Sequence, residues 1–377
     1  MTGVGDSDKK LSFNQIISKA FIFHFNGNLI KAKEYYKYLI DQGCQDVRVF
    51  TNYANIQQES KNLHESIELY KKAIKIDPNH ADSYFNLGRV LIVLNQLKEA
   101  ENCILRAIQI KPILPEAYFN LGCIYSSQNR IKESEKYYRI AIYQNPNFQA
   151  AYNNLAIVFK EIGELEEAEI LLRKSININQ SLIEPYITLI SVLEAKEALL
   201  EAEVIARKVT KTWPNSYDGH YNLGCILRKI GKLEESESTY RKAISLDPNS
   251  FSAYFNLGIV FKELGKLKEA KLSFFKAIEL MPGFAKAYFG LSKLELLQGN
   301  YRSGLENYEY RLKIKELAIP HAKPKCIQVD HERLKQEETL LVISEQGLGD
   351  TIQYMRYIPY LRKQGFDVSF CAQTKLH

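Results

Sequence analysis

Six prolines of this 377-residue chain follow one repeating interval. They are separated by 34, 34, 68, 34 and 34 residues, and they are Pro78, Pro112, Pro146, Pro214, Pro248 and Pro282. A fixed period of 34 residues means that one supersecondary unit recurs along the chain. Each copy is too small to bury its own apolar face, so neighbouring copies must stack. The interval therefore predicts a solenoid of stacked units.

The residues within one copy indicate a pair of helices. In the copy at residues 81–114, Leu87 and Leu91 are four apart, on one face of a first helix. Ala100 and Ala107 line the facing side of a second helix. Residue types that tolerate a left-handed backbone stand between the two helices, and proline ends the second. The turns are expected near Asn95, Asn129, Gly163, Gly231, Gly265 and Gly299.

The repeating unit resembles the tetratricopeptide repeat. The consensus of that family has an aromatic residue, Leu-Gly, two alanines and proline at the positions that are here Tyr84, Leu87-Gly88, Ala100, Ala107 and Pro112. The resemblance implies an all-α fold: a right-handed superhelix of about nine helix pairs over residues 13–314, after a flexible tail at 1–12. No strand is expected between residues 47 and 284. The recurring aromatic residues are expected in the packing seam between helices: Tyr84, Tyr118, Tyr152, Tyr186, Tyr254 and Tyr288.

Composition excludes several classes of protein. The chain has no run of eighteen apolar residues, and its start, MTGVGDSDKK, lacks the apolar segment of a secretory signal, so we expect a cytoplasmic protein that binds no membrane. Six cysteines show no metal-ligand spacing and are interpreted as reduced packing residues. The 50 basic and 44 acidic residues are mixed without a basic run, which argues against nucleic-acid binding. The oligomeric state is not predicted.

Asparagine recurs just before the leucine of the first helix, and Thr188 interrupts the row. Because asparagine is a poor helix former, its recurrence within a helix requires an explanation. A row of carboxamides can hold the N–H and C=O groups of an extended peptide in the concave groove of a superhelix. The row resembles the asparagine ladder of the O-GlcNAc transferase superhelix; inheritance of a common consensus residue is the alternative. Its members are Asn52, Asn86, Asn120, Asn154, Asn222 and Asn256.

The 34-residue rhythm stops after about residue 314. Residues 315–338 are interpreted as a linker, and two apolar runs at 339–344 and 366–371 with a helical pattern between them predict the β-α-β start of a Rossmann-like segment. The stretch EQGLGDTIQYMRY at 345–357 resembles the opening of the glycosyltransferase-like domain that follows tetratricopeptide arrays in many bacterial proteins.

That resemblance assigns roles to a short loop. The segment is also more distantly similar to the acceptor-side Rossmann-like domain of heptosyltransferases, and by that resemblance Asp350 matches their general base, while Gly347 and Gly349 belong to the acceptor-side loop. The alternative is that Asp350 is an ordinary helix N-cap. A dinucleotide fingerprint is disfavoured because its third glycine falls on Ile352.

Two hypotheses of function follow from these patterns. The first is a scaffold that binds peptides or proteins, serving as the substrate-presenting arm of a protein glycosyltransferase similar to O-GlcNAc transferase. Residues 339–377 are expected to be only part of such a domain, so we expect this chain alone to be inactive and to hold no cofactor or metal. A nucleotide sugar such as UDP-GlcNAc is implied only for a complete parent enzyme. The second hypothesis is a non-catalytic assembly scaffold or a co-chaperone-like adaptor.

Overall fold

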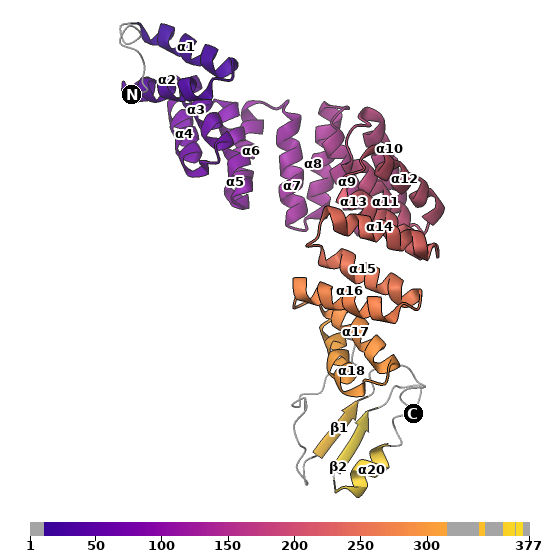
Figure 1. The fold of residues 1–377 in the computed structure, drawn as a ribbon. Helices are drawn as coiled ribbons and strands as arrows, with labels where there is room; N and C mark the ends of the chain where they lie inside the picture. The colour runs from indigo at the N-terminus through magenta and orange to yellow at the C-terminus, as the bar shows by residue number, and fades with distance from the viewer. Residues whose placement is uncertain (1–10, 315–338, 344–356, 366, 372–377) are drawn as a thin grey trace. The chain divides into compact units, whose positions relative to one another are not determined.

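The computed structural model describes residues 11–314, 339–343, 357–365 and 367–371 (Figure 1). Between Phe13 and Tyr308 it consists of eighteen helices in tandem and their connecting turns, with no strand at residues 47–284. The all-α solenoid of nine helix pairs is therefore confirmed. The chain divides into two compact units, Met1–Ile226 and Leu227–His377, and the boundary falls within one helix.

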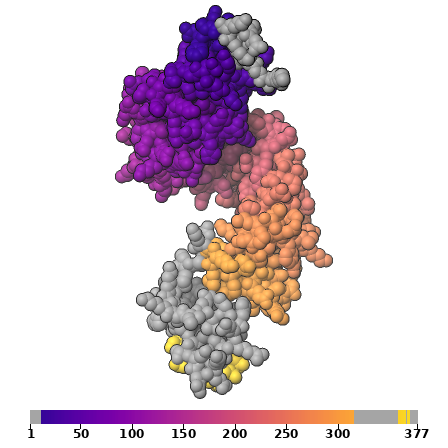
Figure 2. Space-filling view, turned by 90° about the vertical axis from the view of Figure 1, so that its left-hand side faces the viewer, coloured from indigo at the N-terminus to yellow at the C-terminus, as the bar shows by residue number. Residues whose placement is uncertain are grey.

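Unit 1 contains six helix pairs and most of a further first helix. In the space-filling view, its described residues pack into a continuous body, coloured from indigo onward (Figure 2). The helices are α1 (Phe13–Phe25), α2 (Leu29–Asp41), α3 (Val47–Glu59), α4 (Leu63–Ile76), α5 (Ala81–Val93), α6 (Leu97–Ile110), α7 (Pro115–Ser127), α8 (Ile131–Gln144), α9 (Gln149–Ile162), α10 (Leu165–Ile178), α11 (Glu184–Ala195), α12 (Leu199–Thr212) and α13 (Tyr217–Lys229).

Unit 2 begins at Leu227, within α13, and continues the helix pairs before a short parallel strand pair. Its helices are α14 (Leu233–Leu246), α15 (Phe251–Glu263), α16 (Leu267–Leu280), α17 (Ala285–Leu297) and α18 (Tyr301–Tyr308), followed by the 3₁₀ helix η2 (Glu309–Lys313). Strand β1 (Thr339–Ile343) pairs in parallel with β2 (Asp367–Cys371), with Thr339 opposite Asp367, and α20 (Tyr357–Lys363) lies between them in the sequence.

The turns within the helix pairs confirm the expected left-handed positions. All six expected residues have positive φ, from 58° at Asn95 to 87° at Gly163. Lys61 and Glu197 hold the same place in their own repeats with φ of 62° and 61°, although neither residue type favours that region. The position in the repeat therefore fixes this backbone conformation, whichever residue occupies it.

The second helices end where the prolines require. Helix α4 stops at Ile76, and Asp77, which precedes Pro78, has an extended backbone with φ −130° and ψ 98°. Proline disfavours the helical region for the residue before it, so the helix cannot continue. Each unit that carries the proline is thereby ended before the next first helix begins.

Within a pair, a small residue on one helix faces a large one on the other. A Cβ atom added to Gly122 on α7 would lie 2.5 Å from the ring of Tyr138 on α8, which is 2 % exposed. In the copy at residues 183–216 the sizes are reversed. Ile190 on α11 and Ala206 on α12 occupy the corresponding positions, and both are fully buried. The two residues keep a similar combined volume, which close packing of the interior requires.

Candidate functional site

The first helices of successive repeats form one layer. In unit 1, each of α3, α5, α7 and α9 contacts the next first helix as well as its own partner, and α15 contacts α17 in unit 2. Among the described residues, successive second helices show no comparable contact. The first helices of a unit therefore lie closer together than its second helices. We call this row of first helices in each unit the first-helix layer.

The asparagine row lies on this layer. Its members come from α3, α5, α7, α9 and α13 in unit 1 and from α15 in unit 2, and each of the six side chains is half-buried. Half-burial leaves part of each carboxamide accessible to solvent while neighbouring helices restrict its movement. The contacts of the individual side chains differ, and they divide the row into two groups.

Asn86 belongs to the first group, which bonds to the preceding repeat. Its Nδ2 donates to Oδ1 of Asn55 on α3, 3.3 Å away, and the same oxygen accepts from the hydroxyl of Tyr70 on α4 at 2.5 Å. Burial raises the pKa of Tyr70 to about 12, so the hydroxyl stays protonated and remains a donor at neutral pH. The carboxamide of Asn86 is thus held through its nitrogen.

Asn154 makes the same contact two repeats later. Its Nδ2 donates to Sγ of Cys123 and to the hydroxyl of Tyr138, each at 3.5 Å. The Tyr138 hydroxyl in turn donates to Cys123 Sγ at 3.4 Å. Burial raises the pKa of the Cys123 thiol, which therefore stays neutral and serves as a packing and bonding group.

A tyrosine on the second helix marks each asparagine of this first group. Asn52 bonds to Tyr36, and Asn256 also has an interaction partner. In all four cases the tyrosine precedes the asparagine by sixteen residues, at Tyr36, Tyr70, Tyr138 and Tyr240. We call this pairing the tyrosine–asparagine contact: Asn52 and Asn154 bond the tyrosine directly, whereas Asn86 and Tyr70 both bond to Oδ1 of Asn55. Sequence reasoning missed it, although the sixteen-residue spacing is a signal that could have revealed it.

The second group lacks this tyrosine. Ile104 stands sixteen residues before Asn120, and Ala206 stands sixteen residues before Asn222. The structure gives neither asparagine side chain a hydrogen bond with any described residue. Thr188, which interrupts the row, instead donates its hydroxyl to the carbonyl oxygen of Glu184 within its own helix, at 3.0 Å.

The structure also bears on the other sequence-based candidates. Cys44, Cys103, Cys123 and Cys225 form no disulfide among the described residues, and no group of three or more His, Cys, Asp or Glu side chains in that part of the chain could hold a metal ion. None of the helices described here is long and apolar enough to cross a membrane. The loop residues Gly347, Gly349 and Asp350 lie outside the described residues.

Comparison with known proteins agrees with the helix pairs. Residues 47–80, 69–102, 115–148, 149–185 and 251–283 match families described as tetratricopeptide repeat, and residues 224–265 match a family described as TPR repeat. The comparison with curated proteins found no match.

Among solved structures, the chain is similar to one described as the crystal structure of the APC/C hetero-tetramer Cut9-Hcn1. The identity is 16% and the TM-score is 0.53, over 76% of this chain and 57% of that chain. The present chain thus spans little more than half the length of the structure it matches, and the likeness concerns the fold alone. Together with the repeat matches, the helix pairs and their 34-residue period make this chain a tetratricopeptide repeat protein.

Proposed function

We propose that this chain is a scaffold that holds an extended segment of a protein partner against its first-helix layer. Tetratricopeptide repeats imply a protein-binding scaffold. The asparagine row supports the choice of surface, because it supplies half-buried polar groups from successive first helices. The right-handed superhelix and its concave groove stay predictions, and the proposal places the bound segment in that groove.

The tyrosine–asparagine contact supports a specific polarity of binding. At Asn86 and Asn154 the nitrogen Nδ2 is used toward the preceding repeat, whereas Oδ1 has no partner among the described residues. A carboxamide held in this way offers a fixed acceptor, so a peptide N–H can bind without first ordering the side chain. Asn120, which lies between them in the row, can turn either its oxygen or its nitrogen outward.

The spacing of the asparagines in the row suits an extended peptide. Packed helices lie about 8–10 Å apart, and an extended peptide rises about 3.4 Å per residue. One asparagine would therefore meet the peptide roughly every three residues. A segment that contacts Asn86, Asn120 and Asn154 needs at least about seven residues by this spacing.

The test is selection of binding peptides from a random twelve-residue display library, followed by affinity measurement with asparagine variants. Each lost hydrogen bond is worth about 0.5–1.5 kcal/mol, so changing Asn86, Asn120 and Asn154 together to alanine should weaken binding about ten-fold or more. Asn102→Ala, on the exposed side of second helix α6, is the matched control and should leave the affinity unchanged.

Asn120→Ala separates binding from stability. Because no hydrogen bond holds the Asn120 side chain in the described part of the chain, this single variant should keep the melting temperature while losing affinity. Failure of the library to yield any binding peptide would reject the proposed function. Equal affinity in the triple variant would assign the asparagines to packing between repeats.

A second candidate function is the substrate-presenting arm of a protein glycosyltransferase. Its support is the parallel pairing of β1 and β2 with α20 between them in the sequence, the arrangement expected of a β-α-β segment. In this proposal Asp350 is the general base, with Gly347 and Gly349 in the acceptor-side loop.

Transfer of labelled N-acetylglucosamine from UDP-GlcNAc to a bound peptide tests this candidate, using the chain extended by any coding sequence that follows codon 377. The Asp350→Asn variant should keep the fold by circular dichroism and lose transfer. Full activity in that variant would leave Asp350 as a helix cap, and no transfer by the extended wild-type protein would remove the candidate.

A further inference from the structure

The positive charge of this chain is concentrated in one part of the repeat array. Residues 1–226 contain 26 basic and 26 acidic residues, so they carry no net charge. Residues 227–314 contain 15 basic and 10 acidic residues. Residues 227–314 therefore supply five of the six net positive charges of the chain.

Within unit 2, the excess lies on the first helices. The second helices α14, α16 and α18 contain six basic and six acidic residues. The first helices α15 and α17, with the end of α13, contain two acidic residues, Glu263 and Glu295, and five basic ones: Arg228, Lys229, Lys262, Lys286 and Lys293.

Both acidic residues of this layer are already neutralised by cations. Glu295 is 4 % exposed, and it pairs with Lys271 at 3.3 Å and accepts from Asn307 at 2.9 Å. Glu263 pairs with Arg228 at 3.2 Å. Neither carboxylate is thus left to balance the lysines of α15 and α17.

Lys262 on α15 and Lys293 on α17 stand close enough for the charge of Lys262 to contribute to the lowered pKa of Lys293. Three repeats earlier, the corresponding residues are Lys160 and Ser191, and there the lysine Nζ donates to the serine hydroxyl. A lysine at the position of Lys160 on one first helix therefore reaches the side chain at the position of Ser191 on the next first helix. In unit 2 the position of Ser191 is occupied by Lys293, and neither Lys262 nor Lys293 pairs with a carboxylate among the described residues.

The surroundings of Lys293 keep it close to the helix face. Its Nζ lies 4.2 Å from the ring centroid of Phe289, whose ring packs against Tyr308 with centroids 5.5 Å apart. Lys286 and Gly290 precede Lys293 by seven and three residues, on the same side of α17. Gly290 stands at the place where other repeats carry asparagine, and the ring of Phe274 packs against it, since an added Cβ would lie 3.0 Å from that ring.

We propose that Lys262 and Lys293 bind the carboxylates of an acidic, extended protein segment that lies on the first-helix layer of unit 2. This inference rests on the proposed function and names the chemistry of the partner. Two like charges in neighbouring positions are stabilised by an anion between them. The lowered pKa of Lys293, caused by burial and by the charge of Lys262, is the effect that such an anion would reverse.

An acidic protein segment fits this surface better than a nucleic acid does. Nucleic-acid binding rests on cations that neutralise many phosphates, whereas this layer has five basic side chains, one of which, Arg228, is already paired with Glu263. The layer also presents Asn256, a member of the asparagine row, which suits a peptide backbone. The lysine ammonium groups on two adjacent first helices can pair with carboxylates that are spaced along one extended chain.

The experiment compares three twelve-residue probes on the full chain: a peptide of alternating Glu and Ser, its Gln and Ser analogue, and a mixed-sequence single-stranded RNA. Fluorescence anisotropy at 50 mM and 200 mM salt reports the affinity. We expect the acidic peptide to bind at least ten-fold more tightly than the other two. RNA binding as tight as the acidic peptide would overturn the inference.

Charge-reversed variants locate the binding surface. The double variant Lys262→Glu with Lys293→Glu should weaken binding of the acidic peptide at least ten-fold. The matched double variant Lys242→Glu with Lys268→Glu, on second helices α14 and α16, makes the same change in net charge and should alter binding less than two-fold. Equal losses in both would overturn the inference by showing an effect of net charge alone.

The outcome also separates this inference from the proposed function. If library peptides bind the chain but the acidic probe binds no better than its glutamine analogue, the chemistry assigned to the partner is wrong and the scaffold function stands. If no library peptide binds, the proposed function fails as well.

Discussion

Enlarging Gly122 tests the packing that holds each helix pair together. The alanine Cβ would lie 2.5 Å from Cε1 and 2.6 Å from Cδ1 of Tyr138, distances that real Cβ contacts do not show. Overpacking of a core costs about 1–3 kcal/mol, and we expect Gly122→Ala to lower the free energy of unfolding by that amount. Tyr138 has little room to yield, because it is 2 % exposed and its hydroxyl bonds to Cys123.

The following repeat shows how the loss can be offset. At the same two positions it carries Ala156 and Leu172, and both are fully buried. The double variant Gly122→Ala with Tyr138→Leu copies that pair, so it should lose at least about 1 kcal/mol less than the sum of the two single variants. Urea denaturation followed by far-ultraviolet circular dichroism gives the four unfolding free energies. Strict additivity would refute the claim that these two side chains share one space.

Three further predictions follow from the turns, the ion pairs and the tyrosine–asparagine contact. Glu197→Gly should raise the free energy of unfolding by about 0.5–1 kcal/mol because it removes the strain of a left-handed backbone, and Gly163→Ala should lower it by about 1–2 kcal/mol. Thermal denaturation measures both changes, and an unchanged stability of the Glu197→Gly protein would contradict the reasoning. Contacts with Lys196 and Arg173 hold the pKa of Glu169 below its usual 4.5, so its contribution is complete above that pH and is lost as the pH falls through the lowered value. The melting temperatures of wild type and Glu169→Gln should therefore converge in acid, and a constant difference down to pH 3 would refute this. Tyr70→Phe removes the hydroxyl that bonds Asn55 and should destabilise the chain by about 0.5–1.5 kcal/mol without weakening peptide binding more than two-fold; a larger loss of affinity would make Tyr70 part of the binding surface.

The sequence predicts the helix pairs well because every copy repeats the same local requirements. Proline ends the second helices, and small residues mark the close approach of two backbones, so the 34-residue period locates both features. Lys61 and Glu197 show that the period predicts the turns better than residue type does, since both adopt the left-handed conformation against their own preference. Backbone hydrogen bonds within the pair close these turns, from Asn62 N–H to the Gln57 carbonyl and from Ala198 N–H to the Leu193 carbonyl.

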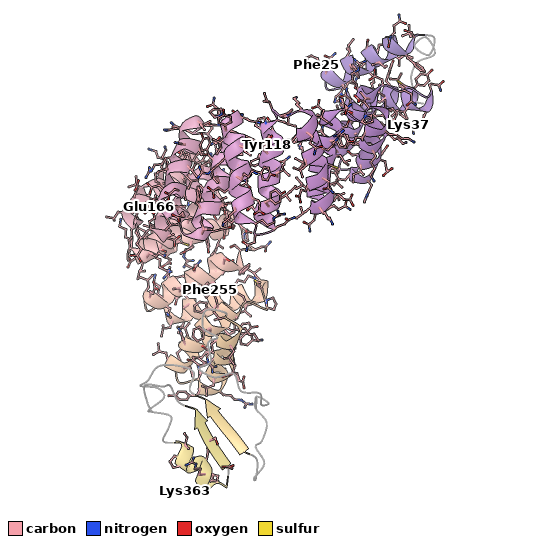
Figure 3. All side chains as sticks on the ribbon, turned by 180° about the vertical axis from the view of Figure 1, so that it is seen from behind. Phe25, Lys37, Tyr118, Glu166, Phe255 and Lys363 are labelled. Carbon is pink, nitrogen blue, oxygen red and sulfur yellow. The ribbon has the colours of Figure 1, made fainter. Side chains whose placement is uncertain are left out.

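The sequence predicts the burial of individual aromatic residues less well. Tyr186 is 1 % exposed, as expected for the packing seam, but the five other tyrosines at that position, among them Tyr118 (Figure 3), are only half-buried. The other fully buried tyrosines stand on second helices, among them Tyr70 and Tyr138. Their burial depends on a small residue in the facing first helix of the same pair, such as Gly122 opposite Tyr138, and residue type alone does not show that relation.

The asparagine row shows the same limit at the candidate site. Its spacing is visible in the sequence, but Asn86 bonds to the preceding repeat through Asn55, which also bonds Tyr70, whereas Asn120 has isoleucine in place of that tyrosine and makes no such bond with a described residue. Some asparagines of the row therefore contribute to packing between repeats, and the role of the row in binding stays a prediction.

A crystal structure of the chain with a library-selected peptide is the most direct test of the central claim. The account predicts an extended peptide along the first-helix layer of unit 1, with backbone N–H groups donating to Oδ1 of Asn86, Asn120 and Asn154 at hydrogen-bond distance. A peptide bound to the second helices, or one that reaches the first-helix layer without contacting any of these three oxygens, would contradict it.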